Sequence, residues 1–512
     1  MKSRTYNSLK NVSISLVEQV IVTLLTFITR TVFIYKLGET YLGINGLFSN
    51  ILSLLSLSDL GVGTAILFSM YKPRANQDYE KVRALLDLYK KIYCFVGMGM
   101  AILGLALVPY LKWFISGISN ISLEFLSVIY ILYLLNTTIS YFYSYKRSIL
   151  IVEQDNHVIS LIQIFTSLMQ NLGQIIILIL FKNFLMYLLL QILCTLINNI
   201  WISKYVNLHY EYMGKKACPL DNKTKKELKQ NIFAMFISKI SSVTVSSTDN
   251  LLISKFVSTV VLGYYSNYLL IINMLRTVLM KIFEALAGSI GNAVAMKSKE
   301  ESKEVFDRIL FANYWLISIV TICLYTLVNC FIEIWIGKEY LLNQSIVLLL
   351  CINFYMRFIR NTQLAFIDAF GLYWEVRWKS IAETILNVVA SLVFLLYFRL
   401  GIQGILFGTF VSNIFTNFWY EPYLLYLHKF NCELQEYFVN FGKHILITFG
   451  VGFVINVVSV TTNNFFLKIN ICLWGSNIIY ALIFRNSTIF KQYKYMLFEG
   501  LRRGIKYLKK GE

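Results

Sequence analysis

The sequence has little charge and few residues that break helices. Charged residues make up only 15% of the 512 residues, whereas hydrophobic residues make up 57%, and the mean hydropathy is +0.60. A soluble protein of this length needs more charged side chains to cover its surface, so a soluble globular protein is excluded. Because only four prolines occur, we expect few sharp kinks in the helices.

Residues that hold metals or form cross-links are also scarce or scattered. The eight cysteines form no CxxC pair and most fall within apolar stretches, and the four histidines lie far apart in the sequence. Such cysteines usually act as small apolar core residues. We therefore expect no metal site, no disulfide framework and no cofactor.

The chain instead contains long apolar stretches. A helix needs about 20 apolar residues to cross a bilayer, and these stretches lack the strict alternation of transmembrane β-strands. Fourteen spans are predicted: 12–35, 41–70, 91–111, 122–145, 157–181, 183–203, 231–256, 260–286, 306–334, 341–370, 380–398, 402–427, 444–460 and 466–484. The predicted fold class is an all-α polytopic membrane protein.

Positive charge alternates between the gaps that separate the spans. One set of alternate gaps, with both termini, holds 34 of the 47 lysines and arginines, and the other set holds seven. Lysine and arginine favour the cytoplasmic side, so both termini are predicted to be cytoplasmic. This topology explains the net charge of +19, and no nucleic-acid partner is expected.

The longest inner gap divides the spans into six and eight. The predicted organisation is a six-helix lobe at 1–203, a cytoplasmic loop at 204–230, a second six-helix lobe at 231–427, two further helices within 428–484 and a basic tail at 485–512. Shifting the chain by 220 residues places Leu42 and Gly43 on Leu262 and Gly263. Repeats of this kind are common in secondary transporters, where the substrate site lies between the repeated halves.

Cationic side chains inside the spans are the strongest functional signal. A charge near mid-bilayer costs a few kcal/mol, so it usually faces a cavity or a partner. The planar guanidinium suits phosphate or pyrophosphate, and Arg357 and Arg360 share a helix face at a spacing of three. The alternative is that these arginines bind carboxylates or helix carbonyls. Candidate substrate-binding residues are Arg30, Arg276, Lys281, Arg357 and Arg360, although Lys281 could also pair with Glu284.

Three acidic residues are candidates for binding a coupling ion. Asp59 lies in a segment rich in serine and glycine, and Asp249 lies in the polar stretch 241–250. Glu18 lies inside the first predicted span. A carboxylate in such surroundings can bind a proton or sodium, or pair with an arginine.

Three segments near the N-terminus form a recognisable pattern: the run 41–66, the Ser-Met-Tyr-Lys-Pro segment at 69–73 and the segment 85–93. This pattern resembles the polysaccharide-transport flippases of the multidrug/oligosaccharidyl-lipid/polysaccharide exporter superfamily. The number of spans, the short outer loops and the long central inner loop extend the resemblance over the whole chain.

The resemblance implies a V-shaped bundle of two six-helix lobes plus two C-terminal helices, which works by alternating access. It implies a flippase in the bacterial cytoplasmic membrane that moves polyprenyl-pyrophosphate-linked oligosaccharide units for capsule, exopolysaccharide or O-antigen assembly. The implied partners are that lipid-linked glycan, membrane lipids, a polysaccharide polymerase and other assembly proteins.

Two other classes of function stay open. A cation-coupled drug exporter of the same superfamily predicts an acidic or apolar lumen, which the arginines argue against. An integral-membrane enzyme such as a glycan polymerase or acyltransferase usually needs a large outer loop, and the predicted outer gaps are all short.

Overall fold

The computed structural model describes residues 4–56, 62–114, 121–153, 155–210, 220, 247–296, 298–462 and 464–492. Within these ranges the chain consists of helices and their connecting turns, without a strand. Nine of the described helices are long and apolar enough to cross a membrane. The predicted all-α, multi-pass membrane fold is therefore confirmed, whereas the count of fourteen spans stays a prediction.

The chain divides into two compact units. Unit 1 comprises Met1–Leu270 and Trp374–Gly408, and unit 2 comprises Ile271–Tyr373 and Thr409–Glu512. Two borders between the units fall inside helices α11 (Thr259–Met296) and α16 (Gly401–Phe415), and the third follows Tyr373, the first residue of α15 (Tyr373–Leu392). The lobe boundaries expected from the sequence stay a prediction.

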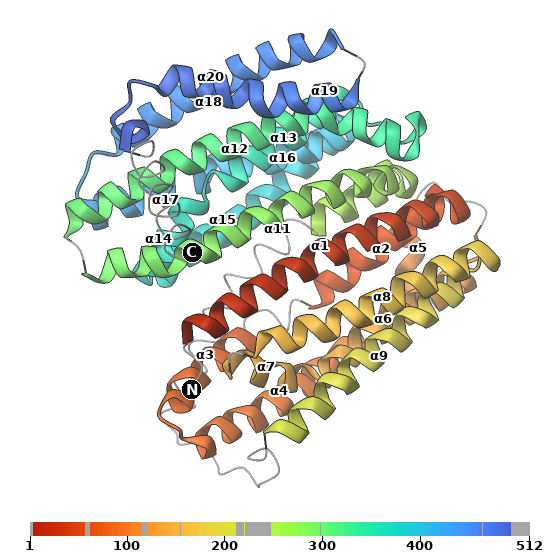
Figure 1. Cartoon of the computed structure of the whole chain (residues 1–512). Helices are drawn as coiled ribbons and strands as arrows, with labels where there is room; N and C mark the ends of the chain where they lie inside the picture. Colours follow the sequence, from red (N-terminus) through yellow and green to blue (C-terminus); the bar gives the residue numbers. More distant parts are fainter. Residues whose placement is uncertain are drawn as a thin grey trace, which may run out of the picture. The chain divides into compact units, whose positions relative to one another are not determined.

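Unit 1 is built mainly from the N-terminal helices (Figure 1). They are α1 (Arg4–Leu37), α2 (Glu39–Leu55), α3 (Val62–Ala75), α4 (Tyr79–Ala106), α5 (Leu111–Phe114), α6 (Leu123–Tyr141), α7 (Ser144–Val152), α8 (Asn156–Leu180) and α9 (Phe184–His209). The beginning of α11, most of α15, the π-helical turn Val393–Tyr397 and the first part of α16 complete the unit.

Helix α8 is central to the packing of unit 1, because it contacts both α1 and α9 along their lengths (Figure 1). The α1–α8 contact contains a buried hydrogen bond of 2.7 Å from the Thr29 hydroxyl to Asn171 Oδ1. Phe33 of α1 packs edge-on against the rings of Phe184 and Tyr187 at the start of α9. Aromatic packing and a few satisfied polar pairs thus hold these helices together.

Unit 2 contains most of α11, the end of α16 and the C-terminal helices. These are α12 (Lys299–Ile336), α13 (Gln344–Phe358), α14 (Asn361–Phe370), α17 (Asn417–Leu425), α18 (Leu434–Val460), α19 (Phe465–Asn470) and α20 (Ser476–Phe484). A capping box of Ser298 and Glu301 begins α12. At 38 residues this helix is longer than a bilayer crossing requires.

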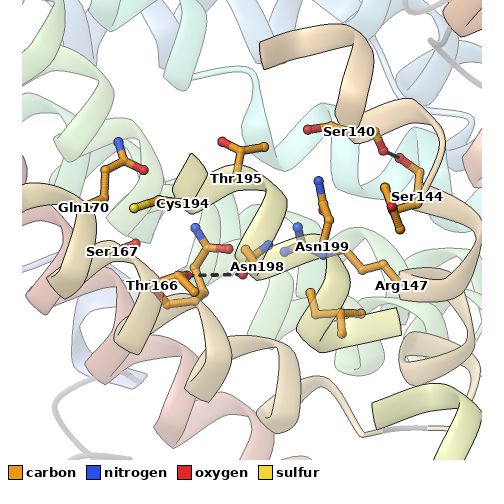
Figure 2. Close-up of a pocket in the computed structure, with 13 residues that line it drawn as sticks. Ser140, Ser144, Arg147, Thr166, Ser167, Gln170, Cys194, Thr195, Asn198 and Asn199 are labelled. Atoms are coloured by element: carbon orange, nitrogen blue, oxygen red, sulfur yellow. Dashed lines mark hydrogen bonds between the residues drawn. The ribbon is translucent and has the colours of Figure 1, made fainter. Parts of the chain in front are cut away.

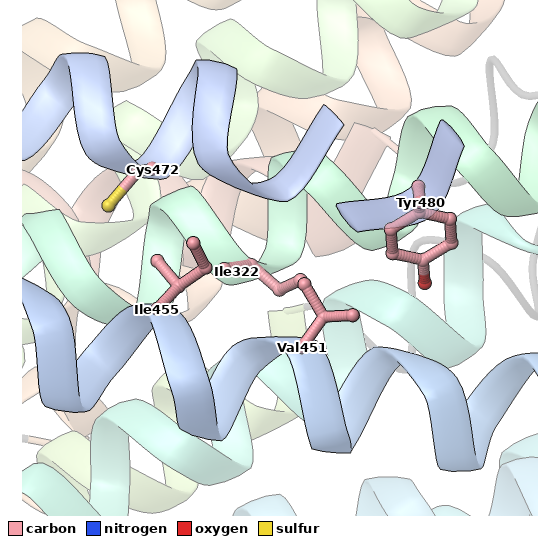
Figure 3. Packing of buried hydrophobic residues seen from close by; sticks show 5 residues of the cluster. All are labelled: Ile322, Val451, Ile455, Cys472 and Tyr480. Atoms are coloured by element: carbon pink, nitrogen blue, oxygen red, sulfur yellow. The ribbon is translucent and has the colours of Figure 1, made fainter. Parts of the chain in front are cut away.

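The C-terminal helices pack onto α12 and α18 around a small apolar cluster. The cluster consists of Ile322, Val451, Ile455, Cys472 and Tyr480 (Figure 3). A π-helical turn at Ile471–Gly475 separates α19 from α20, and α19 and α20 cover α12. The last two predicted spans are therefore an integral layer of unit 2.

The predicted single span 341–370 is two helices in the structure. It is interrupted at Ile359 and Arg360, between α13 and α14. Buried Asn313 of α12 donates to the carbonyls of Phe358 at 3.1 Å and Ile359 at 2.9 Å. These bonds satisfy carbonyls at the interruption, which would be costly to leave unpaired in a membrane.

Candidate functional site

Arg30 lies in α1, seven residues before the helix ends at Leu37. Its Nε and Nη2 groups donate to Asn267 Oδ1 at 3.2 and 3.1 Å, and Nη2 also donates to Ser266 Oγ at 2.5 Å. Both acceptors belong to the N-terminal part of α11, and Asn267 is fully buried. Among the described residues, Nη1 has no acceptor, so two N–H groups of Arg30 are available to a ligand.

The partners of Arg30 carry no charge. In the described part of the chain, no carboxylate lies within ion-pair distance of its guanidinium, and the ionisable groups that influence it are the hydroxyls of Tyr133 and Tyr187. Amide and hydroxyl oxygens orient the guanidinium but leave its positive charge in place. A half-buried arginine of this kind attracts an anionic group.

A close glycine contact brings α2 against α11 near this site. A Cβ on Gly43 would collide with the backbone oxygen of Thr259, and a Cβ on Gly263 would lie 3.0 Å from the backbone oxygen of Glu39. The contact is reciprocal, because the offset of 220 residues relates Gly43 to Gly263 and also Glu39 to Thr259. Reciprocal contacts of this kind are compatible with the predicted repeat, which stays a prediction.

Two side-chain hydrogen bonds lie near the same contact between α2 and α11. The Tyr264 hydroxyl donates to Glu39 Oε2 at 2.5 Å, and Asn250 Nδ2 donates to Asn50 Oδ1 at 2.8 Å. Glycine at the crossing allows these side chains to meet, because the two backbones approach closely. The crossing therefore fixes the position of α11, which carries the partners of Arg30.

Arg360, in unit 2, has a charged partner. Its Nε and Nη2 groups donate to the two carboxylate oxygens of Glu421 at 2.8 and 2.5 Å, and Nη1 donates to Asn413 Oδ1 at 3.1 Å. The Glu421 side chain is fully buried. A bidentate pair of this geometry neutralises the guanidinium and uses its fork of donors.

The other predicted cations have different surroundings. Arg276 and Arg357 are exposed, on α11 and in the last turn of α13, and Lys281 is half-buried on α11. The Glu284 side chain, the predicted alternative partner of Lys281, lies outside the described residues. Arg357 and Arg360 were expected on one helix, but the interruption at Ile359 and Arg360 separates them.

The predicted acidic residues do not form one cluster within the described part of the chain. Asp249 is 7% exposed and lies within electrostatic range of the buried Tyr265. Glu18 is half-buried in α1, where its charge acts on Arg147 at the start of α7. Asp59 lies outside the described residues.

The sequence did not predict the residues that hold Arg30 and Arg360 and that decide whether the charge of each guanidinium is neutralised. Glu421 neutralises Arg360 across 61 residues of sequence, and Ser266 and Asn267 hold Arg30 across more than 230. A carboxylate next to Pro422 inside an apolar stretch is a signal that could have singled out Glu421. Nothing in the sequence pairs Arg30 with its amide partner.

Searches by sequence and by structure gave different results. No family model matches the chain, and no curated protein matches it. Solved structures do match, and they are polytopic transporters. The chain therefore has a fold similar to that of transporters described as members of the MOP superfamily.

Three matches illustrate this similarity. A multidrug resistance MATE family transporter in an inward-facing conformation matches with a TM-score of 0.64 and 16% identity, over 82% of this chain and 99% of its own. The lipid II flippase MurJ in an inward closed conformation matches with a TM-score of 0.64 and 15% identity, over 92% and 98%. A MOP superfamily transporter from Pyrococcus furiosus, described as having reversed polarity of its binding pocket, matches with a TM-score of 0.57 and 13% identity, over 83% and 96%.

Proposed function

We propose that this protein is a flippase of the bacterial cytoplasmic membrane that translocates polyprenyl-pyrophosphate-linked oligosaccharide units. The products feed capsule, exopolysaccharide or O-antigen assembly, and a polysaccharide polymerase and other assembly proteins act with it. The transported unit is anionic at its pyrophosphate, so the site that binds it must present uncompensated positive charge.

Arg30 carries this proposal. Its guanidinium is oriented by Ser266 and Asn267, keeps its charge, and has two N–H groups without a protein acceptor among the described residues. Arginine remains charged in almost any environment and binds phosphate oxygens through its fork of donors. We also assign Arg276, Lys281 and Arg357 to substrate binding, as the sequence predicts. Arg360 completes the predicted set, and it would bind the anion while its guanidinium is also paired with Glu421.

The extent of the structural matches supports the flippase over the exporter. The lipid II flippase aligns with 92% of this chain, whereas the MATE transporter of equal TM-score aligns with 82%. A larger part of this chain therefore has a counterpart in a protein described as moving a lipid-linked molecule. We assign Glu18, Asp59 and Asp249 to binding of a coupling ion.

The proposal is tested in a deletion strain complemented with variants. Wild-type protein should restore surface polysaccharide fully, and Arg30→Lys should restore it in part. Arg30→Ala should not restore it. Lipid-linked repeat units should then accumulate on the inner leaflet, where a membrane-impermeant oxidant added to spheroplasts cannot reach them. Arg308→Ala is the matched control, because Arg308 lies outside the predicted substrate-binding set and its ion pair with Glu304, at 3.8 Å, is made within one helix. Full output from Arg30→Ala at normal membrane levels would refute the proposal.

The second candidate is a multidrug exporter. It is favoured by the MATE match, which covers 99% of that transporter. In this case the deletion strain would keep normal surface polysaccharide and lose tolerance to cationic drugs. The uncompensated charge of Arg30 would repel such substrates, which is why the flippase is preferred.

A further inference from the structure

Unit 1 contains a polar pocket that plays no part in the proposed binding of pyrophosphate. The pocket has a volume of about 240 Å³ and lies among α6, α7, α8 and α9 (Figure 2). Most of its lining residues carry amide or hydroxyl groups, and Arg147 of α7 also lines it. Neither Arg30 nor the predicted coupling residues line it.

The polar residues of this pocket recur at helical spacing on two facing helices. Positions 163, 166, 167 and 170 of α8 all carry amide or hydroxyl groups, as do positions 195, 198 and 199 of α9. Both helices are apolar enough to cross a membrane. Polar stripes on two adjacent membrane helices are costly unless they face each other across a polar space, as they do here.

Several of these side chains have unused hydrogen-bonding capacity. Thr166 donates to Asn198 Oδ1 at 3.2 Å, which fixes one amide at the wall. Among the described residues, the side chains of Gln163, Gln170, Thr195 and Asn199 form no hydrogen bond with the protein, and Asn199 Nδ2 is shielded from solvent without an acceptor. Water satisfies such groups in an empty cavity, and a ligand with hydroxyl groups satisfies them equally well.

The charges of the lining residues also determine whether the pocket favours a cationic or an anionic ligand. No carboxylate is among the lining side chains, and Glu18, whose charge acts on Arg147, lies outside the lining. Arg147 is its only charged lining residue, and Figure 2 shows Arg147 at one end of the polar row and Gln170 at the other. This arrangement suits a molecule with hydroxyl groups along its body and a phosphate or carboxylate at one end.

The volume limits the ligand to a small molecule. Pockets for drug-sized ligands measure roughly 300–1,000 Å³, and this pocket is smaller. We propose that it binds one anionic sugar ring, or an anionic polyol of similar size, with the hydroxyls on the amides and the phosphate or carboxylate on Arg147. The proposal goes beyond the flippase function, because binding here does not depend on which molecule is transported.

The test uses the purified full-length protein in phosphatidylcholine nanodiscs, with calorimetric titration. The probe is glucose 6-phosphate, and glucose, inorganic phosphate and choline are the comparisons. Glucose 6-phosphate should bind saturably and more tightly than glucose or phosphate alone, and choline should not bind. No binding of glucose 6-phosphate, which would mean a cavity filled by water only, or tighter binding of choline, would overturn the proposal.

Variants locate the binding in the pocket. Arg147→Gln should weaken binding of glucose 6-phosphate about tenfold or more, since a hydrogen bond to a charged group is lost. Thr195→Val is nearly isosteric, so it should fold and should weaken binding by a smaller factor. Gln191→Met is the matched control, because Gln191 is a half-buried polar residue one turn before Thr195 on α9 but does not line the pocket. Unchanged affinity in both Arg147→Gln and Thr195→Val would place the binding elsewhere and refute the site.

The source of the ligand is distinguished by adding phosphatidylglycerol to the nanodiscs. If this lipid weakens binding of glucose 6-phosphate to the wild type but not to Arg147→Gln, its glycerol phosphate headgroup occupies the pocket. If it has no effect, the ligand is a soluble sugar phosphate or sugar acid. Because no lipid-linked glycan is present, a failed binding test leaves the flippase proposal standing.

Discussion

Unit 1 and unit 2 each contain an arginine held by side chains of a distant helix, but the two arginines differ in the charge of their partners. Arg30 is held by an amide and a hydroxyl, whereas Arg360 is held by both oxygens of a fully buried carboxylate. The first arrangement keeps a positive charge available to a ligand, and the second cancels it. Two arginines with the same sequence signal therefore differ in the net charge that they and their partners carry.

The largest expected effect is on the stability of unit 2, in Glu421→Gln. The substitution leaves Arg360 buried without its counter-charge, which should cost about 3–5 kcal/mol of unfolding free energy. We expect a strongly lowered midpoint of thermal unfolding for the purified protein, and reduced levels in the membrane.

Two controls isolate the buried charge. Glu436→Gln removes a half-exposed carboxylate that contacts Lys303 at 3.2 Å, and it should cost under about 1 kcal/mol. The double variant Arg360→Met with Glu421→Leu should recover most of the stability, because neither charge remains. If Glu421→Gln is as stable as Glu436→Gln, Arg360 is not neutralised in the way described here.

The second prediction makes the Arg30 site resemble the Arg360 site. Asn267→Asp places a carboxylate about where the amide oxygen now accepts two N–H bonds from Arg30. The protein should fold with little change in stability, since a well-formed pair roughly balances its desolvation cost. Surface polysaccharide in the complemented deletion strain should fall by tenfold or more, on the order of the effect of one charge-assisted bond. Asn267→Ser, which keeps the site uncharged, is the control and should retain more output than Asn267→Asp.

These two sites show why the sequence predicted the fold better than the site. The all-α multi-pass fold follows from local composition, because each apolar stretch alone specifies a membrane helix. The surroundings of Arg30 and Arg360 depend on helices brought together by packing, and no local pattern encodes Glu421 as the partner of Arg360. The repeat is an intermediate case: the offset aligned Gly43 with Gly263, but only the structure shows that the two glycines touch.

The third prediction concerns the crossing that supports the Arg30 site. Gly43→Ala places a methyl group against the backbone oxygen of Thr259, which cannot rotate away. Gly46→Ala meets only ordinary contacts at 3.8 Å or more, so it measures the gain in helix propensity alone. The two variants should differ by about 1–3 kcal/mol in unfolding free energy, with Gly43→Ala the less stable. Equal stabilities would show that the crossing is looser than the structure indicates.

The smallest expected effect separates orientation from charge at Arg30. Ser266→Ala removes one acceptor of the guanidinium, while Asn267 keeps two bonds to it, so the charge and most of its orientation remain. The loss of one hydrogen bond should lower the unfolding free energy by about 0.5–1.5 kcal/mol and leave surface polysaccharide close to wild type. Ser53→Ala, at an exposed position of α2, is the control and should be within about 0.5 kcal/mol of wild type. A loss of polysaccharide in Ser266→Ala as severe as in Asn267→Asp would mean that orientation, rather than uncompensated charge, distinguishes Arg30 from Arg360.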